Sequence, residues 1–154
     1  MAETYELQTS VVIDAPASKI FDTMLDLNKF DAWNPFPLMD PTSVGTVTQT
    51  KPGVGSVYEY QGKRLGKGRQ IVTEAVKPHL IVSEMTFLNR KPEVTRVEYR
   101  IEQQTVGTLV TWYMSGTRSF GQRVMVKLLN LDKMMGNHFA QGLDRLKDYV
   151  EAAK

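Results

Sequence analysis

The chain has 154 residues, with 19 Lys and Arg, 17 Asp and Glu, two His and no Cys, and its formal net charge is +2. This length predicts one domain, residues 1–154, which is large enough to bury an apolar core without disulfides. So small a charge gives no support to nucleic acid or a membrane surface as a partner, and the lack of cysteine excludes disulfide frameworks and thiolate catalysis.

The N-terminal part of the chain predicts a strand followed by a helix. Residues 5–14 are β-branched and partly alternating, which is typical of a strand. A proline follows, which favours the first turn of a helix, and apolar residues at helical spacing predict a helix over residues 17–27. Residues 28–33 are compatible with a second short helical turn, and we expect Pro35 and Pro37 to end it.

The middle of the chain has the two-residue period of strands. Six strands separated by turn residues are predicted, at residues 43–50, 54–60, 66–76, 80–88, 94–104 and 108–117. Val97, Tyr99 and Ile101 alternate with charged residues, so their strand should have one dry and one wet face. The pattern predicts consecutive antiparallel hairpins.

The last segment, residues 119–152, predicts one long amphipathic helix. Its apolar residues recur every three or four positions, at Val124, Leu128, Leu131, Met135, Phe139, Leu143, Leu146 and Val150. Gly136 and Gly142 each cost such a helix about 1 kcal/mol relative to alanine, so they are either merely tolerated or allow a close approach. A sheet with one dry face needs a cover, and this helix can supply it. We therefore expect an α+β fold in which a curved antiparallel sheet of about seven strands wraps on a long C-terminal helix, with one or two short helices after the first strand.

Five local strings occur in a characteristic order along nearly the whole chain. They are Val-Ile-Asp-Ala-Pro-Ala at 12–17, Phe-x-x-Trp-Asn-Pro at 30–35, Gly-x-Gly-x-x-Tyr at 53–58, Gly-Thr-x-Val-Thr-Trp at 107–112 and Asp-Lys-Met-Met-Gly at 132–136. In this order they resemble the START-like (SRPBCC) superfamily, and its polyketide cyclase/dehydrase branch in particular. The resemblance implies a helix-grip fold with a deep cavity between sheet and helix, commonly used for lipids, polyketides, hormones or other hydrophobic molecules. It implies no universal catalytic residue, so it informs the fold more than the chemistry.

Glycines and basic residues cluster between the second and third predicted strands of the middle segment. The run at 62–68 has three residues between its glycines where a Walker A loop needs four, and Gly68 stands where that loop binds magnesium through Ser or Thr. We interpret these residues as hairpin glycines. The basic side chains of the same region are Lys63, Arg64, Lys67 and Arg69. We interpret them as a solvated hairpin end rather than a polyanion site.

The titratable residues form no recognisable catalytic or metal-binding signature. His79 and His138 lack the spacing of metal ligands, so neither a metal site nor another cofactor is predicted. Glu59 should face away from its tyrosine neighbours, and Glu84 is expected to be exposed. An inward Glu84 would have a raised pKa unless a cation such as Arg69 or Arg100 paired with it, and would be the best single argument for an enzyme.

Large rings and thioethers on the predicted dry faces point to a ligand pocket. The candidate ligand-binding residues are Trp33, Tyr58, Tyr60, Met85, Phe87, Tyr99, Trp112, Met114, Met135, Phe139 and Leu143. Core packing alone would explain any one of them; together with the resemblance they predict a ligand-sized void.

Three functions are compatible with these patterns. The first is binding or carrying a lipid- or polyketide-like hydrophobic small molecule in a cavity between sheet and helix. The second is a small cyclase-, dehydratase- or hydrolase-like enzyme that uses tyrosine and a cavity glutamate in the same place. The third and weakest is a protein-interaction module that uses the basic hairpin. The chain has no secretory signal or membrane span, so a cytoplasmic protein without integral membrane association is predicted, with the oligomeric state, a dimer included, left open.

Overall fold

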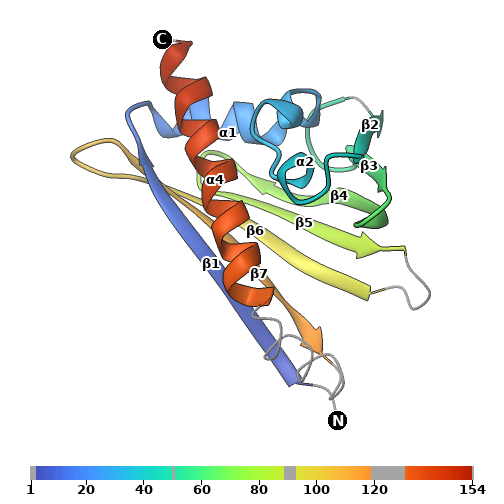
Figure 1. Ribbon diagram of the computed structural model, residues 1–154. Coiled ribbons are helices and arrows are strands. Elements are labelled where there is room, and N and C mark those ends of the chain that lie inside the picture. Colours follow the sequence, from blue (N-terminus) through green and yellow to red (C-terminus); the bar gives the residue numbers. More distant parts are fainter. Residues whose placement is uncertain (1–2, 50, 89–92, 119–130, 154) are drawn as a thin grey trace.

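The computed structural model describes residues 3–49, 51–88, 93–118 and 131–153 (Figure 1). Along the chain its elements are β1 (Glu3–Ile13), α1 (Ala17–Leu25), η1 (Leu27–Ala32), α2 (Phe36–Met39), β2 (Val44–Gln49), β3 (Val57–Gly62), β4 (Gly66–Val76), β5 (Leu80–Phe87), β6 (Glu93–Gln103), β7 (Thr108–Arg118) and α4 (Leu131–Ala152).

The strands form one antiparallel sheet of seven strands, in the order β1-β7-β6-β5-β4-β3-β2. Strands β2 to β7 each pair with their neighbours in sequence, while β1 pairs with β7 and brings Val11 opposite Val110. Every predicted strand is present, and their ends differ from the prediction by up to three residues. The predicted helix-grip architecture is confirmed.

The two faces of the sheet differ as the alternation in β6 predicted. Val97, Tyr99 and Ile101 are buried on one face. On the other face Glu98 accepts hydrogen bonds from the guanidinium groups of Arg96 and Arg100, each at 2.8 Å. The dry face is therefore the one that the helices cover.

Helix α4 lies across the dry face of the sheet, with α1 and α2 beside it (Figure 1). Its apolar stripe is buried at Phe139, Leu143, Leu146 and Val150, as predicted. The first part of the predicted helix, residues 119–130, lies outside the described residues. The confirmed portion of the helix thus begins at Leu131.

A close approach between α4 and the loop after η1 explains Gly142. A Cβ atom at Gly142 would lie 3.0 Å from the carbonyl oxygen of Trp33 and 3.3 Å from Cδ of Pro35, whereas one at Gly136 would meet no atom within 4 Å. This distinguishes the two alternatives left open from sequence. Gly142 permits a close contact with the loop, and Gly136 is merely tolerated.

Alanine substitutions should separate these two glycines. Gly136→Ala should raise the free energy of unfolding by about 1 kcal/mol, because the helix gains propensity and nothing is displaced. Gly142→Ala should gain less or lose stability, since the same propensity gain is opposed by crowding against the Trp33 carbonyl. Urea unfolding of both variants measures the difference. Equal gains in the free energy of unfolding would show that the loop after η1 moves away from Gly142 at no cost, contrary to this account.

The short helical turn predicted at residues 28–33 is η1, which ends before Pro35 as expected, but the sequence did not predict that the two prolines begin another helix. Pro35 is the N-cap of α2 and Pro37 lies in its first turn, so the two prolines begin a short helix. The physical reason is that the first turn of a helix needs no backbone N–H donors, so the N–H that proline lacks is not missed there. The preceding turn is η1, a 3₁₀ helix that Asp26 caps by accepting a hydrogen bond from the Asn28 backbone at 3.0 Å.

Candidate functional site

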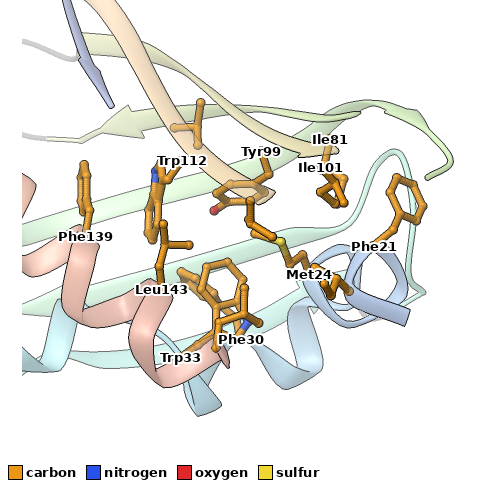
Figure 2. Packing of buried hydrophobic residues seen from close by; sticks show 14 of the residues in the cluster. Phe21, Met24, Phe30, Trp33, Ile81, Tyr99, Ile101, Trp112, Phe139 and Leu143 are labelled. Atoms are coloured by element: carbon orange, nitrogen blue, oxygen red, sulfur yellow. The ribbon is translucent and has the colours of Figure 1, made fainter. Parts of the chain in front are cut away.

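The interior between sheet and helices is a cluster of large rings in mutual contact (Figure 2). Trp112 of β7 stacks on Phe139 of α4, with ring centroids 4.4 Å apart and planes 6° from parallel. Its edge contacts Tyr99 at 5.4 Å and Trp33 at 5.7 Å. All four side chains are at most 2% exposed. The candidate residues on strand, loop and helix are thus brought together.

Beside these rings the described residues enclose a small apolar void of about 20 Å³. It lies between the sheet, α2 and α4, and its lining consists of Phe36, Met39, Tyr60, Leu65, Met85, Phe87, Val97, Trp112, Met114 and Phe139. We call this space the apolar void. Six of its lining residues were candidates from sequence, namely Tyr60, Met85, Phe87, Trp112, Met114 and Phe139.

The expectation of a ligand-sized void is not met by the described residues. A volume of about 20 Å³ holds about one water molecule, whereas pockets for drug-sized ligands usually measure about 300–1,000 Å³. The space is small because Trp33 and Tyr99 fill the interior with rings packed edge to face, 5.5 Å between centroids. Sequence shows that such rings face inward, but not how closely they interlock.

The remaining candidate residues have other positions. Trp33, Tyr58, Tyr99 and Leu143 are buried in the core around the apolar void without lining it. Met135 lies on α4, and its side chain is outside the described residues.

Four lining residues were missing from the sequence-based set. Val97 could have been identified as a lining residue from sequence, because alternation already placed it on the dry face of β6. Phe36 and Met39 belong to α2, a four-residue helix that the sequence did not predict. Leu65 follows a run of charged residues in the turn between β3 and β4, and no pattern marked it as inward.

Two glycines create the flat surface on which the tyrosines of β3 lie. In the ladder Tyr60 is opposite Gly45 of β2 on one side and Gly68 of β4 on the other. A Cβ atom at Gly68 would overlap the ring of Tyr60, and one at Gly45 would overlap the ring and hydroxyl of Tyr58. The rings therefore lean across neighbouring strands into space that any other residue would fill.

The two tyrosines differ in their partners. The Tyr58 hydroxyl donates to Oδ1 of Asp31 at 2.9 Å and accepts from Nδ2 of Asn34 at 2.9 Å. Burial, and then Asp31, raise the pKa of Tyr58 well above its usual value. Burial raises the pKa of Tyr60 to about 12. Both phenols are therefore protonated at neutral pH, and the Tyr58 hydroxyl acts as a hydrogen-bond donor.

A buried carboxylate, Asp40, holds the cover of the apolar void in place. It follows α2 and accepts hydrogen bonds from the Thr42 hydroxyl at 2.6 Å, the Thr42 backbone at 3.0 Å, and the Arg64 and Leu65 backbones at 2.8 and 3.0 Å. The Thr42 hydroxyl and these backbone donors hold the pKa of Asp40 far below its usual range. Asp40 thereby joins α2 to the β3–β4 turn that places Leu65 over the void.

The charged candidates lie on the outside of the sheet. Glu59 and Glu84 are exposed, as expected, and Arg69 is half-buried on the same outer face. His79 is exposed and His138 is half-buried. The inward glutamate that would have argued for an enzyme is therefore not Glu59 or Glu84.

The basic hairpin has the solvated character expected from sequence, because Lys63, Arg64 and Lys67 are exposed. A larger groove of about 870 Å³ opens on this wet face of β2 to β4 and includes Lys63, Lys67, Glu59 and Thr46. It is open to water and its lining includes charged side chains, so it would leave much of a hydrophobic molecule in contact with solvent.

Neither a metal cluster nor a membrane helix is found within the described ranges. The residues that the structure describes contain no group of three or more His, Asp or Glu placed to hold a metal ion. In the same part of the chain, no helix combines the length and apolar character needed to cross a membrane.

Comparison with known proteins supports one family. The model of the family described as polyketide cyclase / dehydrase and lipid transport matches residues 4–151. No curated protein matches the chain.

Solved structures share the fold at low sequence identity. Protein MLL2253 from Mesorhizobium loti has a TM-score of 0.72 and 14% identity, over 97% of this chain and 99% of that one. Protein CV1439 from Chromobacterium violaceum has a TM-score of 0.69 and 16% identity, over 95% and 96%. Norcoclaurine synthase from Thalictrum flavum, solved with dopamine and hydroxybenzaldehyde, has a TM-score of 0.71 and 11% identity, over 99% and 90%.

Proposed function

Because the chain belongs to the polyketide cyclase / dehydrase and lipid transport family, we propose that it binds or carries a hydrophobic small molecule between the sheet and α4. The observation that carries this proposal is the apolar void, whose lining comes from β3, β5, β6, β7, α2, α4 and the β3–β4 turn. An apolar space at the junction of so many elements is a typical place for a hydrophobic ligand.

The flexibility of the lining supports enlargement of the void around a ligand. Three lining side chains are methionines, Met39, Met85 and Met114. An unbranched thioether adapts to new shapes at low cost, because it has three rotatable bonds and no branch to clash. Met39 and Leu65 also belong to α2 and the β3–β4 turn rather than to the centre of the sheet. We propose that a ligand displaces this cover and that the three methionine side chains change rotamer to fit around it.

The enzyme alternative has weaker support. Norcoclaurine synthase shares the fold, but at 11% identity this likeness concerns architecture only. Among the described residues that line the apolar void, Tyr60 is the only titratable one. With its pKa raised to about 12 by burial, it can donate a hydrogen bond but cannot serve as a base at neutral pH. Binding is therefore the better supported role.

The cellular setting stays a prediction from sequence. A cytoplasmic location, and the absence of nucleic acid from the partners, rest on composition and charge. The interaction-module alternative draws support from the exposed basic hairpin alone.

A pair of matched substitutions on β6 tests the proposal. Val97 lines the apolar void, whereas Val94 on the same strand is 58% exposed. The probe is 2-methylnaphthalene, measured by equilibrium dialysis against the purified protein. Val97→Phe should weaken its binding about tenfold or more, since strain from filling the space typically amounts to about 1–3 kcal/mol. Val94→Phe should bind as the unsubstituted protein does.

Two results would contradict the proposal. One is that 2-methylnaphthalene does not bind the unsubstituted protein. The other is that Val97→Phe, folded by circular dichroism, binds the probe as well as Val94→Phe. If Val97→Phe does not fold, Val97→Ile adds a smaller group at the same place and decides the question. Native mass spectrometry after mild extraction from the producing cell would then identify the bound molecule.

A further inference from the structure

Several buried polar atoms of the interior have no hydrogen-bond partner among the residues that the structure describes. They are Nε1 of Trp33 in the loop after η1 and, on the sheet, Oε1 of Gln70, Oγ of Ser83 and Nε1 of Trp112, all on side chains that are at most 1% exposed. Most buried polar groups in proteins are hydrogen-bonded, because leaving one unpaired costs its full desolvation. Three such atoms on the dry face of one sheet therefore require an explanation.

The side chains that carry these atoms lie next to residues that line the apolar void, or belong to its lining. Gln70 is opposite Met85 in the ladder, and Ser83 is opposite Val97. Met85 and Val97 both line the void, as does Trp112 itself. The polar side chains are thus one ladder position from the space in which the proposed ligand would be bound.

Gln70 and Tyr99 form an incomplete hydrogen-bonding pair. Nε2 of Gln70 donates to the Tyr99 hydroxyl at 3.3 Å, while Oε1 of Gln70 accepts no hydrogen bond from any residue that the structure describes. If the amide is turned over, the hydroxyl donates to Oε1 and Nε2 is left unpaired instead. In either orientation the pair has one free amide atom, and the ring of Tyr99 contacts that of Trp112, whose N–H is also free.

A ligand group that forms hydrogen bonds with the free amide atom of Gln70 and the N–H of Trp112 should be neutral. Of the side chains whose burial is described, Asp40 is the only charged one that is buried, and its oxygens are taken by Thr42 and the β3–β4 turn. A charged ligand group would be buried without a counter-charge, which is strongly unfavourable. A hydroxyl both donates and accepts, whereas a ketone only accepts.

Building on the proposed function, we propose that the ligand is a neutral hydrophobic molecule with a hydroxyl group at its inner end. The ligand hydroxyl donates to Oε1 of Gln70 and accepts from the hydroxyl of Tyr99. The free N–H of Trp112 is a further donor to the same oxygen. The rest of the ligand occupies the enlarged apolar void among the methionines.

Three probes of nearly the same shape test this assignment by equilibrium dialysis at pH 7. They are 2-naphthol, which carries a neutral hydroxyl, 2-methylnaphthalene, which carries none, and 2-naphthoate, which is charged. The unsubstituted protein should bind 2-naphthol about tenfold more tightly than 2-methylnaphthalene, equivalent to about 1.4 kcal/mol. It should bind 2-naphthoate more weakly than either.

Substitutions at two glutamines test whether Gln70 is responsible for the tighter binding of 2-naphthol. Gln70→Leu should abolish the preference for 2-naphthol and leave the binding of 2-methylnaphthalene unchanged. Gln61→Leu on β3 is the matched control, because Gln61 is exposed on the wet face, and it should keep the preference. The double variant Gln70→Leu/Tyr99→Phe removes both polar partners together, so it should fold even if Gln70→Leu does not.

The possible failures are distinct. Equal binding of 2-naphthol and 2-methylnaphthalene by the unsubstituted protein would overturn the hydroxyl assignment, as would a preference that survives in the folded Gln70 variants. Tight binding of 2-naphthoate would also overturn it. In each of these cases the proposed binding function stands as long as 2-methylnaphthalene binds. If none of the three probes binds, the proposed function fails, and the assignment with it.

Discussion

Replacing Trp112 by alanine is expected to lower the free energy of unfolding by about 3–5 kcal/mol, the usual cost of truncating a buried aromatic residue to alanine. Trp112 is 1% exposed and stacks on Phe139 with centroids 4.4 Å apart. It also contacts Tyr99 and Trp33, so its removal takes one ring contact from each of three other buried aromatic residues. Because whole domains are stable by only about 5–15 kcal/mol, urea unfolding should show a large shift of the midpoint.

The neighbouring residue on β7 is the control for this substitution. Tyr113 faces the wet side, where its ring lies 4.4 Å from the guanidinium carbon of Arg100. Tyr113→Ala should cost about 0.5–1 kcal/mol, the typical value of an exposed cation–π contact. A folded Trp112→Ala variant that loses no more stability than Tyr113→Ala would show that the ring cluster is not packed as described. Reduced binding of 2-methylnaphthalene by the same variant would add Trp112 to the residues that contact the ligand.

A single methyl group at Gly68 is expected to cost about 1–3 kcal/mol or more, the range for overpacking a filled interior. The added Cβ would overlap the ring of Tyr60, which lies across Gly68 from the adjacent strand. Since Tyr60 lines the apolar void, moving its ring also changes the shape of the void. Urea unfolding of Gly68→Ala measures the stability loss, and dialysis with 2-methylnaphthalene measures the effect on binding.

A double substitution distinguishes this clash from a general effect on β4. Tyr60→Ala removes the ring, so Gly68→Ala should cost little in that background, and the two substitutions should be strongly coupled. If Gly68→Ala is equally destabilising with and without the Tyr60 ring, the cause is the backbone of β4 and the packing explanation is wrong.

Much of the fold was predictable because it depends on local patterns. Alternation in β6 placed Val97 and Tyr99 inward, and the three- and four-residue spacing of Phe139, Leu143 and Leu146 defined the buried face of α4. What failed was the effect of proline in α2. A proline can end a helix or begin one, and only the position of the helical turn relative to Pro35 decides which applies.

Six of the ten residues that line the apolar void were candidates from sequence, but the size of the void was not predictable. Residues such as Tyr60 and Met114 were identified because large apolar side chains on a dry face are recognisable from sequence. The volume of the void depends on how the rings of Trp33, Tyr99 and Trp112 fit against one another, which no periodicity encodes. The buried position of Gln70 was not identified from sequence either, because a polar side chain in a strand ordinarily indicates the wet face.

The strand order described for the sheet has a consequence for how the chain folds. From β2 to β7 each strand pairs with the next one in sequence, so these contacts close only short loops. The pairing of β1 with β7 instead joins residues such as Val11 and Val110, about a hundred positions apart, and closing so long a loop carries a larger entropic cost. We therefore expect six strands to assemble as successive hairpins and β1 to join last, so that the beginning of the chain completes the sheet only after nearly everything else has formed.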